Sequence, residues 1–206
     1  MNNHTSGTIC QKAAQKGRRQ FLRQSVKTAA IVGGSVGVSS FAAPALASAL
    51  TVPAKEPDRK LRLVNAHTWE KLDIVFWTDG MHIDESMSEI SYLMRDHRAN
   101  ESITIDTQLI DDLYNLYQLL DTDERIHILS GYRTQATNAK LRKRSNGVAK
   151  YSLHMEGKAV DLNVPGKTAD QIRLAALSMK SGGVGYYPSS GFVHIDTGNV
   201  RAWNGS

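Results

Sequence analysis

Two short segments of the chain carry histidine and acidic residues at spacings that suit metal binding. The first, SLHMEGKAVD at 152–161, contains His154 and Asp161, and the second, FVHID at 192–196, contains His194 and Asp196. Imidazole and carboxylate are good zinc ligands, and three protein ligands with one open position form the usual catalytic arrangement. The sequence therefore suggests a metal site made of His154, Asp161 and His194. The competing interpretation is that each histidine is a surface residue or a satisfied core residue.

The order of these residues along the chain explains how they would meet. Gly157 lets the chain turn between His154 and Asp161, so that a loop and the following strand deliver both side chains to one point. Side chains two residues apart share a strand face, so Asp196 is expected to point the same way as His194. Four other histidines have no patterned acidic neighbour and are interpreted as structural. They are His67, His82, His127 and His97, the last of which continues the apolar face of a predicted helix.

The elements that must position these residues suggest an α+β domain with a small, mainly antiparallel sheet flanked by helices. Apolar runs bounded by turn residues predict strands at 61–67, 72–77, 126–130, 158–164, 184–187 and 192–197. Apolar spacing of three or four residues predicts helices at 84–98, 109–120, 134–144 and 172–180. Asp106 is the predicted cap of the second helix. Thr168 and Gln171 have the spacing of a capping box before the last one.

The first 47 residues differ from the rest of the chain. They contain six Lys and Arg residues and no Asp or Glu, and a weakly apolar stretch then ends in Ala45-Leu46-Ala47. These features describe a secretory signal, and Arg18-Arg19 resembles the twin-arginine export motif. We therefore predict a signal at 1–47 that is cleaved near Ala47, a linker at 48–60, a domain at 61–206 and a periplasmic location. An uncleaved N-terminal membrane anchor is the alternative.

The net charge of the chain comes mainly from this predicted signal. The 206 residues include 25 Lys+Arg and 20 Asp+Glu, for a formal net charge of +5. Removing the six cations of the signal leaves 19 basic against 20 acidic residues, a net charge of −1. The single cysteine, Cys10, leaves with the same segment, so no disulfide framework is expected. We expect no nucleic-acid partner, and membrane contact only during export.

Several motifs resemble those of a known group of enzymes. The pattern S-x-H-x-x-G-x-A-x-D at 152–161 resembles the zinc motif of the D-Ala-D-Ala carboxypeptidase-like metallopeptidases, which include the LAS-type murein hydrolases. The closer resemblance is to the murein endopeptidase K branch, and it covers nearly all of the chain after residue 60. It rests on ILSGYR at 128–133, GVAK at 147–150, AALSM at 175–179, GGVGYYP at 182–188 and FVHIDTG at 192–198.

This resemblance implies a hedgehog/DD-peptidase-like zinc fold with one Zn²⁺ per chain, held by His154, Asp161 and His194. It implies a hydrolase in which zinc lowers the pKa of a water, while Arg133 polarises the scissile carbonyl. Arg133 would otherwise cap a turn or pair with a surface acid. The implied substrate is the peptidoglycan cross-link, cleaved between two meso-diaminopimelate residues and less between D-Ala and meso-diaminopimelate. The cations within 140–144 are interpreted as a solvated helix face, with attraction of stem-peptide carboxylates as the alternative.

The general base is where this chain departs from better-known relatives. Some of these relatives place a Glu or Asp three residues before the last zinc histidine, where this chain has Gly191; LAS enzymes place a histidine two before it, where this chain has Phe192. Asp196 is the first candidate to replace that base, and Glu156 is the second. Because the usual base is missing, a non-catalytic, zinc-stabilised peptidoglycan-binding module is the alternative function. The sequence identifies no regulatory lipoprotein partner.

Overall fold

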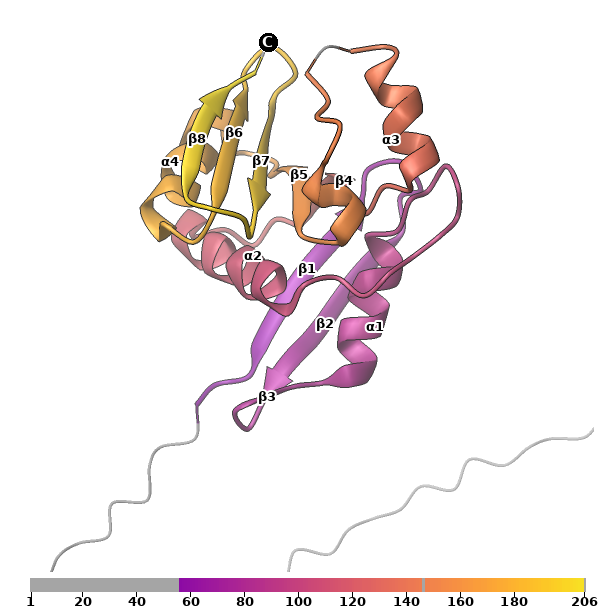
Figure 1. Cartoon of the computed structure of the whole chain (residues 1–206). Coiled ribbons are helices and arrows are strands. Elements are labelled where there is room, and N and C mark those ends of the chain that lie inside the picture. Colours follow the sequence, from indigo (N-terminus) through magenta and orange to yellow (C-terminus); the bar gives the residue numbers. More distant parts are fainter. Residues whose placement is uncertain (1–55, 146, 206) are drawn as a thin grey trace, which may run out of the picture. The chain divides into compact units, whose positions relative to one another are not determined.

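The described part of the chain is an α+β domain, as the sequence predicts. The computed structural model describes residues 56–145 and 147–205. The predicted export signal at 1–47 and most of the predicted linker at 48–60 lie outside these ranges. Within them, one eight-stranded sheet is accompanied by four α-helices and a short 3₁₀ helix (Figure 1).

All six predicted strands and all four predicted helices are present, most of them with shifted ends, and two further strands join them. The strands are β1 (Arg59–Asn65), β2 (Lys71–Thr78), β3 (Met81–His82), β4 (Ile126–Ser130), β5 (Ala159–Asn163), β6 (Gly183–Tyr187), β7 (Phe192–Asp196) and β8 (Arg201–Asn204). The helices are α1 (Asp84–Leu93), α2 (Thr107–Leu120), α3 (Gln135–Arg142), the 3₁₀ helix η1 (Leu153–Glu156) and α4 (Ala169–Met179).

The sheet is larger than predicted and is mixed. Its strand order is β3-β2-β1-β4-β5-β7-β6-β8. The β1–β4 and β6–β8 pairs are parallel, whereas the other five pairs are antiparallel. This order places β5 between β4 and β7, so the strand that carries Asp161 lies next to the strand that carries His194.

Helix α2 supplies much of the hydrophobic core. Leu109, Leu113 and Leu116 are fully buried, at the spacing that the sequence pattern predicts. The predicted cap is confirmed, because the Asp106 side chain accepts a hydrogen bond from the backbone nitrogen of Gln108 at 3.0 Å. Helix α2 packs on β1 and α4, and α4 packs on β6 and β7 (Figure 1). These helices therefore support the strands that carry the candidate ligands.

The predicted capping box of α4 is also confirmed. The Thr168 hydroxyl accepts from the backbone nitrogen of Gln171 at 3.2 Å, and the Gln171 side chain accepts from the backbone nitrogen of Thr168 at 2.8 Å. The two residues satisfy donors that the first turn of a helix leaves free. The helix consequently begins at Ala169, three residues before the predicted start.

The prediction that α1 continues to residue 98 is wrong. The helix ends at Leu93, and Met94 turns the chain toward the loop that follows β4, where the Met94 carbonyl accepts from the backbone nitrogen of Tyr132 at 2.8 Å. His97 therefore does not continue an apolar helix face. Its ring instead stacks on the ring of His67, with centroids 4.0 Å apart. A tertiary contact made far along the chain ends a helix whose local pattern would have continued.

Both ends of the described chain contain strand residues that the sequence pattern does not indicate. β1 begins at Arg59, inside the predicted linker, where the guanidinium lies over the ring of Trp77 at 4.2 Å. β8 is a short, largely polar strand that pairs in parallel with β6. β8 forms an edge of the sheet and brings Arg201 and Trp203 beside β6 and β7.

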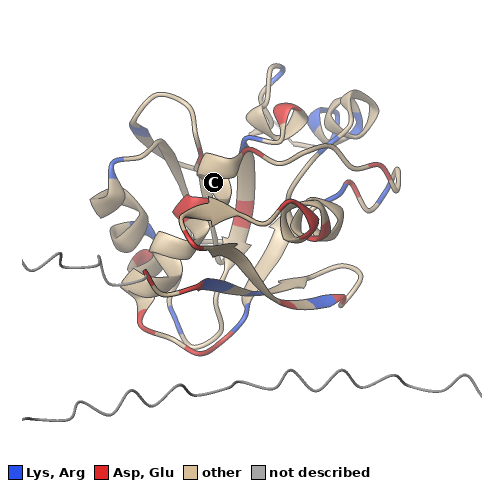
Figure 2. Cartoon of the chain, turned by 90° about the horizontal axis from the view of Figure 1, so that it is seen from below, with Lys and Arg blue, Asp and Glu red and all other residues tan. Residues whose placement is uncertain are grey.

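Charged residues of both signs are interspersed along the described chain (Figure 2). The cations at the end of α3, Lys140, Arg142, Lys143 and Arg144, are exposed, in keeping with a solvated helix face. None of the four lines the cleft described below. No helix among the described residues is long and apolar enough to span a bilayer.

Candidate metal centre

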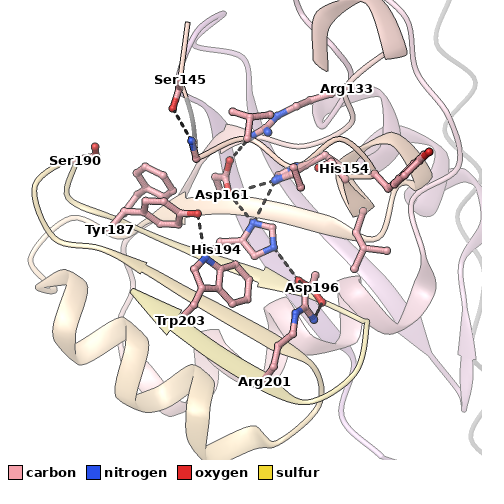
Figure 3. Close-up of a pocket in the computed structure, with 17 residues that line it drawn as sticks. Arg133, Ser145, His154, Asp161, Tyr187, Ser190, His194, Asp196, Arg201 and Trp203 are labelled. Carbon is pink, nitrogen blue, oxygen red and sulfur yellow. Dashed lines mark hydrogen bonds and ion pairs between the residues drawn. The ribbon is translucent and has the colours of Figure 1, made fainter. Parts of the chain in front are cut away.

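The structure brings the three predicted metal ligands together. Asp161 on β5 is the direct register partner of His194 on β7, and η1 delivers His154 from the preceding loop. His194 Nδ1 lies 2.8 Å from Asp161 Oδ1 and 3.2 Å from His154 Nε2, and the last two atoms are 3.3 Å apart (Figure 3). These residues form the one group of three metal-ligating side chains found within the described chain.

The turn between His154 and Asp161 depends on glycine, as predicted. Gly157 follows η1 with φ of +69°, a left-handed conformation that other residues adopt at a cost. A Cβ atom at this position would also lie 2.8 Å from the carbonyl oxygen of Thr104. Gly157 therefore allows the chain to pass from η1 into β5 within a few residues, which places His154 against Asp161.

Hydrogen bonds on the far side of each imidazole favour a proton on its outer nitrogen. His154 Nδ1 donates to the carbonyl oxygen of Gly131 at 2.7 Å, since a carbonyl can only accept. His194 Nε2 donates to the carboxylate of Asp196 at 2.9 Å for the same reason. When both imidazoles are neutral and keep their protons on these outer nitrogens, the lone pairs of His154 Nε2 and His194 Nδ1 face each other and Asp161. Two lone pairs and an anionic oxygen at this distance repel one another unless a cation lies among them.

The geometry of these donors fits zinc. A tetrahedral ion with Zn–N and Zn–O bonds of about 2.0–2.1 Å sets its ligand atoms about 3.3 Å apart. The three observed separations lie between 2.8 and 3.3 Å. His154, Asp161 and His194 would hold the ion, and their opposite sides are already bound to Gly131, an arginine and Asp196, respectively.

Burial and charge shift the pKa values of these groups in different directions. Burial lowers the pKa of His154, because a charged imidazole is poorly solvated there. Burial acts the same way on His194, but contacts with the carboxylates of Asp161 and Asp196 outweigh it and raise the pKa of His194. Burial would raise the pKa of Asp161, yet the nearby histidines lower it well below its ordinary value. A carboxylate that stays ionised here suits a metal ligand.

Arg133 lies beside the candidate metal centre. Its Nε donates to the Ser130 hydroxyl at 2.7 Å, and its Nη2 is paired with Asp161 Oδ2. Asp161 therefore directs one oxygen toward the two histidines and the other toward Arg133. The guanidinium also lines the open cleft (Figure 3).

The two predicted candidates for the general base have different surroundings. Asp196 shares the strand face of His194, as predicted, but its carboxylate contacts the ring nitrogen that faces away from the ligand cluster. Glu156 is not brought to the site: its side chain is 56% exposed, pairs with Lys158 Nζ at 2.9 Å and does not line the cleft. The Asp196 side chain, by contrast, is fully buried.

The cluster lies in the wall of a cleft of about 440 Å³. One side of the cleft is aromatic: Tyr187 stacks on Phe192 with centroids 4.4 Å apart, and Trp203 Nε1 donates to the Tyr187 hydroxyl at 3.1 Å. The motif predictions include Tyr187 and Phe192 only as parts of longer runs, and they leave out Trp203. The one hint of Trp203 in the sequence is the glycine at position 185. The structure explains this glycine, because a Cβ atom there would lie 2.6 Å from the Trp203 ring.

Two histidines and an aspartate beside an open cleft form a ligand set typical of a mononuclear metallohydrolase. Comparison with known proteins agrees with this class. A family model described as peptidoglycan L,D-endopeptidase MepK matches residues 53–203. The chain belongs to this family.

Two curated relatives illustrate the extent of the similarity. The peptidoglycan L,D-endopeptidase MepK of Escherichia coli strain K12 is 44% identical over 177 residues, which cover 86% of this chain and 95% of that protein. The probable peptidoglycan L,D-endopeptidase MepK of Haemophilus influenzae is 38% identical over 159 residues, which cover 77% and 86%. The matches therefore include most of the described domain.

Proposed function

We propose that this protein is a zinc-dependent endopeptidase that hydrolyses peptide cross-links of peptidoglycan. The observation that carries the proposal is the cluster of His154, Asp161 and His194, with an inner nitrogen of each histidine directed at Asp161, beside a cleft in a chain of the MepK family. When bound, zinc supplies a Lewis acid and lowers the pKa of a water nucleophile. The proposal includes one Zn²⁺ per chain and a hedgehog/DD-peptidase-like fold.

Arg133 is the residue that we assign to the scissile carbonyl. A guanidinium has five N–H donors, of which the contacts with Ser130 and Asp161 use two. The remaining donors lie on a side chain that lines the cleft, where they would polarise the carbonyl and stabilise the developing negative charge. The pairing with Asp161 fixes the direction of the guanidinium before substrate binds.

We propose that the scissile bond joins two meso-diaminopimelate residues, with D-Ala–meso-diaminopimelate bonds cleaved less readily. The L,D-endopeptidase names of the relatives support the first bond. The aromatic side of the cleft, made by Tyr187, Phe192 and Trp203, offers apolar surface for the aliphatic chain of diaminopimelate. The substrate lies outside the inner membrane, which supports our proposal of a periplasmic enzyme exported by the twin-arginine route and cleaved near Ala47.

The test is incubation of the zinc-loaded protein with purified muropeptide dimers that contain either a 3-3 or a 4-3 cross-link. We expect monomers from the 3-3 dimer, fewer from the 4-3 dimer and none from either when a chelator is present. Arg133→Ala should lower the rate while leaving one zinc per chain. Hydrolysis that persists fully in the chelator or in Arg133→Ala would overturn the proposed mechanism.

One observation favours a second candidate, a non-catalytic zinc-stabilised module that binds peptidoglycan. The acidic residues among the described cleft residues are Asp161 and Asp196, and each carboxylate is held by an arginine. Neither is free to act as a general base. Zinc-loaded protein that sediments with purified sacculi but releases no monomers from either dimer would establish this module in place of the enzyme.

A further inference from the structure

Asp196 is the most constrained side chain beside the candidate metal centre. Arg201 Nη1 and Nη2 donate to its two oxygens at 2.9 and 2.6 Å, respectively. The backbone nitrogens of Gly183 and Gly198 donate to Oδ1 at 3.2 and 2.9 Å. His194 Nε2 donates to Oδ2 at 2.9 Å. Five hydrogen bonds from three segments of the chain therefore hold one carboxylate that has no exposed surface.

The position of Asp196 relative to the imidazole limits what it does. His194 presents Nδ1 to Asp161 and His154, and it presents Nε2 to Asp196 (Figure 3). The imidazole ring therefore stands between the carboxylate and the point where the three donor atoms meet. A base that takes a proton from a water at that point would have to reach past the ring of His194.

We propose that Asp196 and Arg201 act as positioning residues, which hold His194 with Nε2 protonated and Nδ1 free to bind the metal. The inference deepens the proposed function and rests on it for the identity of the metal. It gives Asp196 a role different from the predicted general base. A carboxylate bound to the outer nitrogen of a metal-ligating histidine fixes the tautomer and orientation of the ring.

The final strand completes this arrangement. Arg201 is the first residue of β8, its side chain is 45% exposed, and it lines the cleft on the side where Asp196 is buried. Its guanidinium lies 5.0 Å from the ring centre of Trp203 on the same strand. Gly183 leaves the space that this pair needs, because a Cβ there would lie 2.4 Å from Arg201 Nη1 and 2.6 Å from Asp196 Oδ2. Through Arg201 and Asp196, β8 therefore helps to set the orientation of His194 beside the cleft.

The experiment measures zinc affinity by competition with a chromophoric chelator and the visible absorption of the Co²⁺-loaded protein. The variants are Asp196→Asn, Asp196→Ala, Arg201→Met, Arg201→Lys and Gly183→Ala, and circular dichroism checks that each is folded. Asp73→Asn is the matched control, because Asp73 also lies on a strand between two arginines, Arg62 and Arg125, but does not line the cleft. Hydrolysis of the 3-3 dimer at saturating zinc is the last readout.

We expect Asp196→Ala to weaken zinc binding roughly 10- to 100-fold and to shift the Co²⁺ absorption, with hydrolysis largely restored at saturating zinc. Asp196→Asn, Arg201→Met and Gly183→Ala should show smaller changes of the same kind, Arg201→Lys should recover part of the loss, and Asp73→Asn should show none. Asp196→Asn that keeps wild-type zinc affinity and absorption while losing hydrolysis would overturn the proposal in favour of a general base. Unchanged affinity and absorption in all the variants would also overturn it. A wild-type protein that binds zinc but cleaves no dimer would refute the proposed function alone.

Discussion

The described chain contains two contacting pairs of histidines, and they differ in nearly every respect that matters to a metal. His154 and His194 meet edge to face, with ring centroids 5.0 Å apart and an interplanar angle of 65°. His67 and His97 stack with centroids 4.0 Å apart at 24°. The first pair shares the carboxylate of Asp161, whereas the second belongs to no group of three metal-ligating side chains in the described residues.

The contrast shows that contact between histidines does not by itself make a metal site. In the first pair, a carbonyl and a carboxylate bind the outer nitrogens, so both inner nitrogens point to one place. In the second pair, His67 Nε2 instead contacts the carbonyl oxygen of Leu129 at 2.8 Å, and the rings lie face to face. Stacked rings direct their in-plane lone pairs past each other. The acceptors around the rings therefore decide which pair is arranged to bind a metal.

The largest expected effect comes from removing a ligand of the first pair. His194→Ala should weaken zinc binding by more than the roughly 100-fold loss that follows removal of an outer partner, and hydrolysis should disappear with the metal. Bound zinc per chain and monomer release from the 3-3 dimer measure both. The matched control is His97→Ala, which we expect to keep one zinc and wild-type hydrolysis. Equal loss of zinc in His194→Ala and His97→Ala would contradict the assignment of the metal to the first pair.

Zinc should stabilise the folded protein through the first pair alone. Free zinc at 100 times Kd adds about 2.7 kcal/mol to the free energy of unfolding, if only the folded state binds it. For a chain of this size the melting temperature should then rise by roughly 5 to 10 °C. Thermal unfolding with zinc and with chelator measures the shift, which His154→Ala should remove and His67→Ala should keep. If zinc still raised the melting temperature of His154→Ala, the stabilising metal would bind at another site.

Both pairs should also respond to pH, through pKa shifts of opposite sign at His194 and His97. The pKa of His194 is raised, so a proton competes with zinc for Nδ1 more strongly than it would at an ordinary histidine. Zinc affinity should therefore fall as the pH is lowered from 8 to 5.5. Competition titrations across this range measure the loss, and affinity independent of pH would contradict it.

Burial, followed by electrostatic interactions with His67 and Arg98, lowers the pKa of His97 in the folded state. The unfolded chain then binds more protons near its own pKa of about 6.5, so the free energy of unfolding falls as the pH drops through that value. Urea unfolding of metal-free protein should show this slope, and His97→Gln should flatten it. A slope that is unchanged in His97→Gln would assign the proton uptake to another group.

The smallest effect is expected from breaking the pair that lacks carboxylates. His67→Ala removes the hydrogen bond to Leu129 and the ring stack, so unfolding should become easier by about 0.5–1.5 kcal/mol. The number of bound zinc ions should stay at one. Urea unfolding and metal analysis measure the two quantities, and a loss of zinc in this variant would show that the pairs are coupled.

Sequence patterns singled out His154, Asp161 and His194 as candidate metal ligands because each lies in a short motif of suitable residue types. The turn at Gly157 and the partnership of two predicted strands then place Asp161 opposite His194. The end of α1 was mispredicted, because a contact between Met94 and Tyr132 overrides a continuing apolar pattern. Glu156 followed the histidine motif closely, yet it lies on the outer side of η1 and pairs with Lys158.

The final strand escaped prediction for a different reason. β8 has four residues, mostly exposed, without the alternation that marks a half-buried strand. The pairing of β8 with β6 brings Arg201 to Asp196, which lies 5 residues earlier in the chain. Between them, the backbone nitrogen of Gly198 also donates to the Asp196 carboxylate. Strand-face parity correctly placed Asp196 near His194. The alternation of side chains could not reveal that the ring of His194 lies between Asp196 and the other two candidate ligands, since that depends on side-chain rotation.

The most direct test of zinc-dependent hydrolysis is a zinc titration of metal-free protein with the rate of 3-3 dimer hydrolysis as the readout. We expect a rate that rises in proportion to bound zinc and reaches its plateau at one ion per chain, with no activity at any zinc concentration in His194→Ala. Hydrolysis by the metal-free protein, or a fully zinc-loaded protein that leaves the dimer intact, would contradict it.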